Sequence, residues 1–133
     1  VGFDYQFAEP NNRVWPVCLG LPGSLPQINS KAVEYTILTG LALGCQIPEY
    51  TKFDRKYYPY PDLMKGYQIS QYDKPLALQG IMPFDVDGQQ KDINVTRVHL
   101  EEDVAKLSHI SDSSGASSVV DINRTGVAPM VIV

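Results

Sequence analysis

The sequence is short of cysteine: its 133 residues contain only two, Cys18 and Cys45, with no repeated spacing. Disulfide-stabilised secreted domains and cysteine-based zinc sites need more cysteines than this, in closer groups. Long apolar runs are also lacking, so no segment is expected to span a membrane. The opening residues, VGFDYQFAEPNN, do not have the layout of a signal peptide. We therefore expect a reducing compartment and no membrane partner.

Positive charge is scarce as well. Eleven lysines and arginines are outnumbered by fifteen aspartates and glutamates, which gives a net charge of −4. Binding nucleic acid through charge alone normally needs a basic surface, so that class is disfavoured, although a local basic pocket stays compatible with the sequence. No GxxxxGKS phosphate loop occurs. The length suits a single domain, 1–133, with a core of its own.

Proline and glycine, by contrast, are plentiful, at ten residues each. They crowd residues 1–29, and because proline lacks an N–H and restricts its neighbour, we expect an irregular loop there. Residues 50–75 combine prolines with several tyrosines and charged residues, and their strand alternation is weak. This pattern predicts a long structured loop of the kind that often carries functional side chains.

One helix is predicted, with Asn29 or Ser30 as its cap and Gly44 as its stop. Apolar residues spaced three or four apart form one stripe along it, which we expect to face the core. The stripe consists of Val33, Ile37, Leu38 and Leu41.

The second half of the sequence favours β-structure. Asp87-Gly88 separates two alternating runs, which predicts a hairpin because glycine tolerates positive φ. The segments SSVVDINRTGV and PMVIV are two further strand candidates.

The most polar stretch is HLEEDVAKLSH, residues 99–109. If the preceding strand continues through it, side-chain alternation places His99, Glu101 and Asp103 on one face, a spacing that suits a divalent cation. If the stretch is helical, Glu102 and Lys106 form an ordinary surface pair of about 0.3–0.5 kcal/mol. We favour the strand. Spacing alone leaves both the metal site and a solvated acidic surface open.

Basic residues flank these acids. Arg97 and Lys106 lie on either side, and DINR adds Asn123 and Arg124. Acids for a cation next to bases for phosphates suit Mg-nucleotide chemistry. The motifs alone leave nucleotide binding possible and unspecific.

Four long motifs in one order carry a resemblance to a known family. They are AEPNNRVWPVCLGLPGSLPQIN, FDRKYYPYPDLMKGYQISQ, RVHLEED with a following lysine, and VDINRTGV. Together they closely resemble the B subunit of the tRNA-dependent Asp/Glu amidotransferase, the GatB/GatE family, over nearly the whole chain. The resemblance implies an α+β fold, a curved antiparallel sheet with packed helices like the catalytic domain of glutamine synthetase. The chain would be an incomplete part of that N-terminal catalytic (cradle) domain.

The resemblance also implies an activity. Family members use ATP and Mg²⁺ to phosphorylate the side-chain carboxylate of glutamate or aspartate misattached to tRNA(Gln) or tRNA(Asn). Ammonia from the partner amidase then displaces the phosphate, giving Gln-tRNA or Asn-tRNA. The implied partners are the amidase (the A subunit), the small C subunit and the misacylated tRNA, in the bacterial cytoplasm or in an organelle.

Site residues follow from the resemblance position by position. Glu101 and Glu102 match the metal-binding acids, with His99 and Asp103 in the same motif. Residues that match positions lining the catalytic cavity, with the basic ones facing phosphates, are Arg55, Lys56, Tyr67, Gln68, Gln71, Asn123 and Arg124. Lys106 and Arg97 are further candidates for contacting phosphates.

Three departures from the family pattern bear on activity. No Glu-x-His motif precedes Val1, Val131 stands where the family has a glutamate, and Trp15 replaces a cysteine of a zinc site. We therefore expect no zinc and an incomplete ligand set. The alternative function is a non-catalytic scaffold that supports assembly with the amidase.

Overall fold

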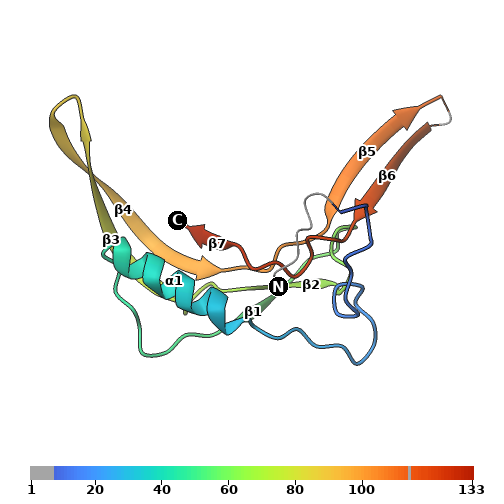
Figure 1. The fold of residues 1–133 in the computed structure, drawn as a ribbon, viewed down its shortest axis with the longest axis horizontal. Helices are drawn as coiled ribbons and strands as arrows, with labels where there is room; N and C mark the ends of the chain where they lie inside the picture. The colour runs from blue at the N-terminus through green and yellow to red at the C-terminus, as the bar shows by residue number, and fades with distance from the viewer. Residues whose placement is uncertain (1–7, 114) are drawn as a thin grey trace. The chain divides into compact units, whose positions relative to one another are not determined.

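The computed structural model describes residues 8–113 and 115–133 and has an α+β fold (Figure 1). Within these ranges the chain forms one α-helix and seven strands. They are α1 (Ser30–Ala42), β1 (Asp54–Tyr57), β2 (Tyr67–Ser70), β3 (Ala77–Val86), β4 (Gln89–Leu100), β5 (Lys106–Asp112), β6 (Gly115–Asp121) and β7 (Met130–Ile132). Residues 8–29 contain neither helix nor strand, as predicted, and the rest of the predicted N-terminal loop lies outside the described residues.

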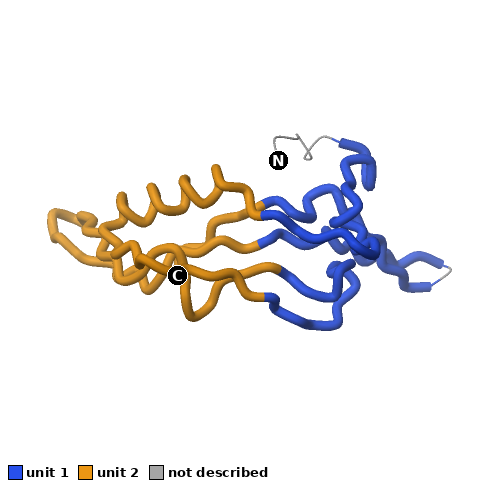
Figure 2. The backbone as a smooth tube through the Cα atoms, turned by 90° about the horizontal axis from the view of Figure 1, so that it is seen from below, with its two compact units in different colours: residues 1–27, 55–68, 102–127 blue, residues 28–54, 69–101, 128–133 orange. Residues whose placement is uncertain are grey.

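The chain divides into two compact units, each assembled from three separate segments (Figure 2). Unit 1 comprises residues 1–27, 55–68 and 102–127, and unit 2 comprises residues 28–54, 69–101 and 128–133. The boundary passes between Glu101 and Glu102, so the two neighbouring acids belong to different units.

Unit 2 is built on an antiparallel sheet with the strand order β3-β4-β7. The predicted hairpin is confirmed: Asp87 and Gly88 connect β3 to β4 with φ values of 55° and 77°. Consecutive positive φ values fit a type I′ turn, whose twist matches that of the strands. The strand predicted in PMVIV is β7, which pairs with the end of β4.

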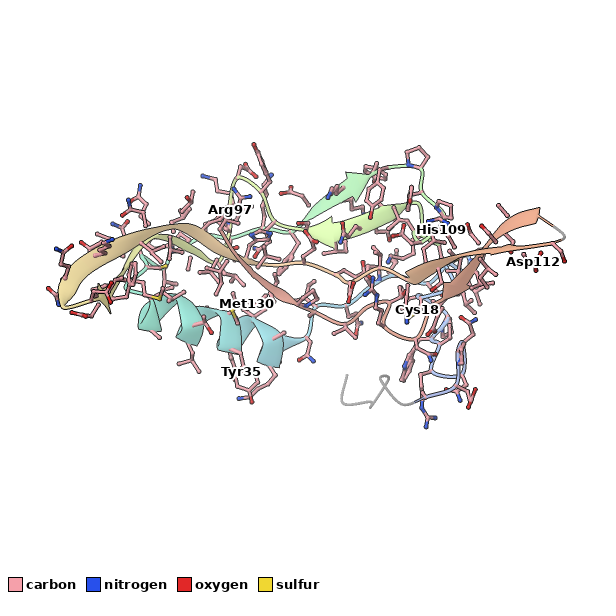
Figure 3. The ribbon with its side chains drawn as sticks, turned by 90° about the horizontal axis from the view of Figure 1, so that it is seen from above. Cys18, Tyr35, Arg97, His109, Asp112 and Met130 are labelled. Atoms are coloured by element: carbon pink, nitrogen blue, oxygen red, sulfur yellow. The ribbon has the colours of Figure 1, made fainter. Side chains whose placement is uncertain are left out.

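Helix α1 covers the sheet of unit 2 (Figures 1 and 3). Its ends are as predicted, since the Asn29 side chain accepts a hydrogen bond from Lys31 N and Gly44 has a φ of 67° beyond the C-cap. The packed face is only partly the predicted one. Thr36 and Gly40 are buried and Val33 and Ile37 are half-buried, whereas Leu38 and Leu41 are 60% and 56% exposed.

A close approach of the helix to the sheet explains this correction. A Cβ built on Gly40 would lie 2.5 Å from the Cβ of Ala77, so only a hydrogen fits there. The core beneath consists of Cys45, Ala77, Val95 and Val98, with Leu43, Ile47 and Met130 packed against it. Small side chains thus form the closest contact, and Leu38 and Leu41 are left exposed, as is Tyr35, which Figure 3 shows directed away from the sheet.

Unit 1 contains the antiparallel β5–β6 hairpin, with Asp112 near its tip (Figure 3). Strand β6 begins two residues before the predicted SSVVDINRTGV segment, at Gly115, and covers only the first part of that segment, up to Asp121. Asn11 joins the irregular N-terminal segment to this hairpin: its Nδ2 donates to Val120 O at 3.0 Å and its Oδ1 accepts from Ile122 N at 2.9 Å. A second small core lies in unit 1. It consists of Cys18, Ala105 and Ile122, with Val14, Val17, Met64 and Val120 packed against it.

Two predictions of local structure need correction. Residues 50–75 are not a continuous loop, because β1 and β2 lie within them and pair in a two-stranded sheet. The acidic stretch is not helical, but strand β4 ends at Leu100 and β5 begins only at Lys106. Between them Glu101 N donates to Pro129 O and Asp103 N donates to Val127 O, so every second residue still pairs as in a strand.

Candidate functional site

Glu102 forms a buried ion pair in unit 1. Its Oε1 lies 2.7 Å from Nζ of Lys65, and the two side chains are 11% and 6% exposed. The main chain of Glu102 is held as well, because Gln68 Nε2 donates to its carbonyl oxygen at 2.7 Å. Lys65 was not among the predicted site residues, although it lies in the same motif as Tyr67 and Gln68. Glu102 therefore already has a cationic partner.

Tyr67, a predicted ligand-binding residue, lies beside two cations in unit 1. The guanidinium of Arg55 is 4.6 Å from the centre of its ring, and Nζ of Lys65 is 5.4 Å from it. Tyr57 packs at a tilt with a centroid distance of 5.8 Å. Cations over an aromatic face are attracted by its quadrupole, so this cluster holds the Arg55 guanidinium close to the sheet while leaving the residue exposed.

Asp103 and Arg124 form an ion pair within unit 1, with 3.6 Å between Oδ1 of Asp103 and Nε of Arg124. Arg124 also donates from Nε to Val104 O at 2.9 Å and from Nη2 to Ala105 O at 3.4 Å. The side chain of Arg124 thus supports the backbone that follows the acids.

Asn123 is buried, and both the oxygen and the nitrogen of its side-chain amide form hydrogen bonds with the N-terminal segment. It accepts from Arg13 N at 2.9 Å and donates to Glu9 O at 2.8 Å. These bonds give Asn123 a structural task beside the predicted one of binding ATP or substrate.

In unit 2, His99 is 4% exposed and its Nδ1 has no hydrogen-bond partner within the described part of the chain. Burial lowers the pKa of His99 below its usual 6.5, the positive charge of Arg97 lowers it further, and Glu101 opposes them. These effects favour the neutral imidazole, the form that coordinates cations. Arg97 lies 5.6 Å from the ring centre of Tyr72, and its Nε is likewise buried without a partner among the described residues.

Glu101 is held by the last residue of β2. Ser70 Oγ donates to Glu101 Oε2 at 3.0 Å. Gln71, 2% exposed, donates from Nε2 to Thr51 Oγ1 and Lys52 O, and its Oε1 accepts from Leu100 N. Ser70 was missed in the sequence, because a serine in a strand gives no local signal of its partner.

The remaining predicted cations, Lys56 and Lys106, are exposed. Nζ of Lys56 lies 5.4 Å from the ring of Tyr58, and Lys106 is paired in register with Asp121 at the base of the β5–β6 hairpin. Exposed cations of this kind can contact phosphate groups without first losing a buried partner.

The metal prediction can be tested against the donor chemistry. The described residues contain no group of three or more His, Cys, Asp or Glu side chains arranged to hold a metal ion. Unit 2 nevertheless contributes two suitable donors, the unpaired Nδ1 of His99 and the Glu101 carboxylate whose charge acts on it. Glu102 and Asp103 are paired with Lys65 and Arg124. The side chains of His99 and Glu101 are donors of the kind that divalent cations accept, and the four-residue ligand set stays a prediction.

No helix in residues 8–113 and 115–133 combines the length and the apolar character needed to cross a membrane.

Comparison with known proteins gives a consistent result. The model of the GatB/GatE catalytic domain matches residues 3–133. Proteins from Dehalococcoides mccartyi and Thermomicrobium roseum are 62% and 61% identical to the chain, each over 98% of the chain and 27% of the relative. A protein from Moorella thermoacetica is 57% identical over 94% of the chain and 26% of the relative. All three are named as the B subunit of an aspartyl/glutamyl-tRNA(Asn/Gln) amidotransferase, and the chain spans about a quarter of their length.

Proposed function

Because the chain belongs to the GatB/GatE catalytic domain family, we propose that it is the carboxylate-activating part of the B subunit of a tRNA-dependent amidotransferase. The substrate is glutamate on tRNA(Gln) or aspartate on tRNA(Asn). A side-chain carboxylate oxygen attacks the γ-phosphorus of ATP, which gives an acyl phosphate and ADP. Ammonia then displaces the phosphate and leaves the side-chain amide. Activation is needed because a carboxylate is a poor electrophile.

The observation that carries this proposal is the family match over residues 3–133, together with the high identity to proteins named as the B subunit. The expected partners are the amidase (the A subunit), the small C subunit and the misacylated tRNA, in the bacterial cytoplasm or an organelle. The α+β fold with antiparallel sheets agrees with a domain of the glutamine synthetase type, which we propose as its fold class.

The residues of this chain have separable tasks in that reaction. His99 and Glu101 would hold Mg²⁺. Glu102 and Asp103, which the sequence also predicts as ligands, are paired with Lys65 and Arg124 and would first have to release them. Mg²⁺ supplies Lewis-acid stabilisation of charge on the phosphate oxygens. The exposed cations Arg55, Lys56 and Lys106 are suited to phosphate contacts, and Arg97 to a carboxylate or phosphate oxygen through its unpaired Nε.

Two of the predicted ligand-binding residues receive a narrower role. The amides of Gln68 and Asn123 bind main-chain atoms of Glu102, Glu9 and Arg13. We propose that they shape the site and that Tyr67, next to Arg55, is the residue of the group best suited to contact ATP.

Calorimetry of ATP binding with and without Mg²⁺ tests the proposal. The chain should bind ATP in a Mg²⁺-dependent manner, and Glu101→Gln should weaken that binding by about tenfold or more. Asp92→Asn, which removes an exposed acid from the strand that precedes Glu101, is the matched control and should leave binding unchanged. Absence of binding by the unaltered chain would favour the scaffold alternative.

A further inference from the structure

We infer that Ser70 and Gln71 are positioning residues that fix the direction of the Glu101 carboxylate and so set the affinity of this site for a divalent cation. The inference rests on the proposed function in one respect, that Glu101 is a cation ligand. Ser70 is the last residue of β2 and Gln71 follows it. Both residues, Glu101 and their hydrogen-bond partners belong to unit 2.

Ser70 acts on the side chain of Glu101. Its hydroxyl donates to Oε2 at 3.0 Å, between residues 31 positions apart in sequence. Both residues are half-buried, so the hydrogen bond is partly shielded from water. A glutamate has three side-chain torsions, and one hydroxyl bonded to its terminal oxygen favours a single rotamer among the many that an unrestrained side chain samples.

Gln71 acts on the main chain just before Glu101. Strand β3 begins at Ala77, opposite Val98, so Leu100 lies beyond the end of that strand. Gln71 Oε1 accepts from Leu100 N at 3.1 Å, as the carbonyl of a neighbouring strand would. Its Nε2 donates to Thr51 Oγ1 at 2.7 Å and to Lys52 O at 3.0 Å. The Gln71 amide thus supplies Leu100 with the hydrogen bond that β3 would have provided if that strand continued alongside β4.

The other edge of this segment is also fixed. Glu101 N donates to Pro129 O at 3.1 Å, and Leu100 is in register with Met130 of β7. The backbone is thus tied on both sides by Gln71 and Pro129, and the hydrogen bond from Ser70 acts on the side-chain torsions of Glu101. Groups that orient a metal ligand typically change cation affinity about 10–100-fold when they are removed.

The first test compares Ser70→Ala with Ser70→Thr, which restores the hydroxyl, and with Ser117→Ala, an exposed serine in unit 1, as control. Side-chain ³J couplings of Glu101 in the cation-free chain report its rotamer. Calorimetry with Mg²⁺ and ATP reports affinity. We expect Ser70→Ala to lower the population of the Glu101 rotamer that Ser70 favours and to weaken cation affinity about tenfold or more, and Ser70→Thr to recover both. Ser117→Ala should change neither.

The second test uses Gln71→Met, an apolar replacement of similar size. Hydrogen exchange should lose protection at the Leu100 amide while protection at the Val98 amide is kept. A variant that lost protection throughout unit 2 would contradict a local positioning role for Gln71.

The outcomes separate this inference from the proposed function. If the parent chain binds no Mg²⁺ with ATP while Ser70→Ala still frees Glu101, the proposed function fails, and with it the cation role, but the positioning geometry stands. A single Glu101 rotamer in Ser70→Ala would overturn the inference. So would unchanged cation affinity in a variant whose Glu101 is disordered, because positioning would then have no effect on the site.

Discussion

Lys65 and Glu102 form the most deeply buried ion pair among the described residues, with 2.7 Å between Nζ and Oε1. A charge pair with so little exposure is costly to break, because the remaining partner is left buried without compensation. The pair therefore ties the segment before β2 to the acidic stretch within unit 1.

Lys65→Met should destabilise the chain by about 3–5 kcal/mol, since it leaves Glu102 without its cation. Lys65→Met combined with Glu102→Gln should recover most of that loss, because no isolated charge remains. Urea unfolding of both variants and of Glu102→Gln alone completes a double-mutant cycle. Equal stabilities for Lys65→Met and the parent would mean that water reaches the pair.

Gly40→Ala should destabilise the chain by about 1–3 kcal/mol, although alanine normally favours a helix. The new Cβ would meet the Cβ of Ala77 at 2.5 Å, and neither atom can rotate away. Leu41→Ala is the matched comparison on the exposed face and should cost less than about 1 kcal/mol, against about 2–5 kcal/mol for a buried leucine. Thermal or urea unfolding measures both, and the opposite order would restore the predicted apolar face of the helix.

Gly88→Ala should cost about 1 kcal/mol, because the second residue of the β3–β4 turn has a φ of 77°. Asp87→Asn should be tolerated, since asparagine accepts positive φ readily. The turn is also braced by Gly88 N donating to Asp85 Oδ1 at 2.9 Å, which neither change removes. Unfolding midpoints of the two variants check the prediction, and a larger loss in Asp87→Asn would refute the turn assignment.

Lys52 bridges Asp54 and Asp73, at 3.0 Å from each. Its hydrogen bond holds the pKa of Asp73 below the usual 3.8. An acid whose pKa is lower in the folded chain stabilises the fold above its unfolded pKa, and that contribution disappears as pH falls below 3.8 through the folded value. Carboxyl NMR titration should show the Asp73 pKa rising toward 3.8 in Lys52→Met. An unchanged titration would show that water screens the pair.

Local signals account for the elements that were predicted correctly. Asn29 can cap a helix through its own side chain, and Asp87-Gly88 supplies the positive φ values that a tight turn needs. The predicted face of α1 was wrong at Leu38 and Leu41 for the converse reason. Hydrophobic spacing favours Leu38 and Leu41, whereas the contact is made by Thr36 and Gly40, whose small size carries no hydrophobic signal.

The motifs identified the family correctly and drew attention to the acidic stretch, but not to the contacts within it. Ser70 is 31 positions from Glu101, and Lys65 is 37 from Glu102. No periodicity links residues so far apart, so their pairing emerges only from the fold. The roles of His99, Glu101 and the basic residues in binding Mg²⁺ and ATP remain predictions for the binding experiments.

The joining of Asn11 to residues 120–122 has a consequence for how the chain is made. Glu9 and Asn123, bonded through the Asn123 amide, are 114 positions apart, so this part of unit 1 cannot close until residue 123 has left the ribosome. Closing long loops late slows folding and prolongs exposure of the apolar residues around Cys18. During synthesis from the N-terminus, residues 9–13 therefore lack their hydrogen-bond partners until the end of the chain has been made. Chaperone protection during translation would benefit this chain more than a chain built from local contacts.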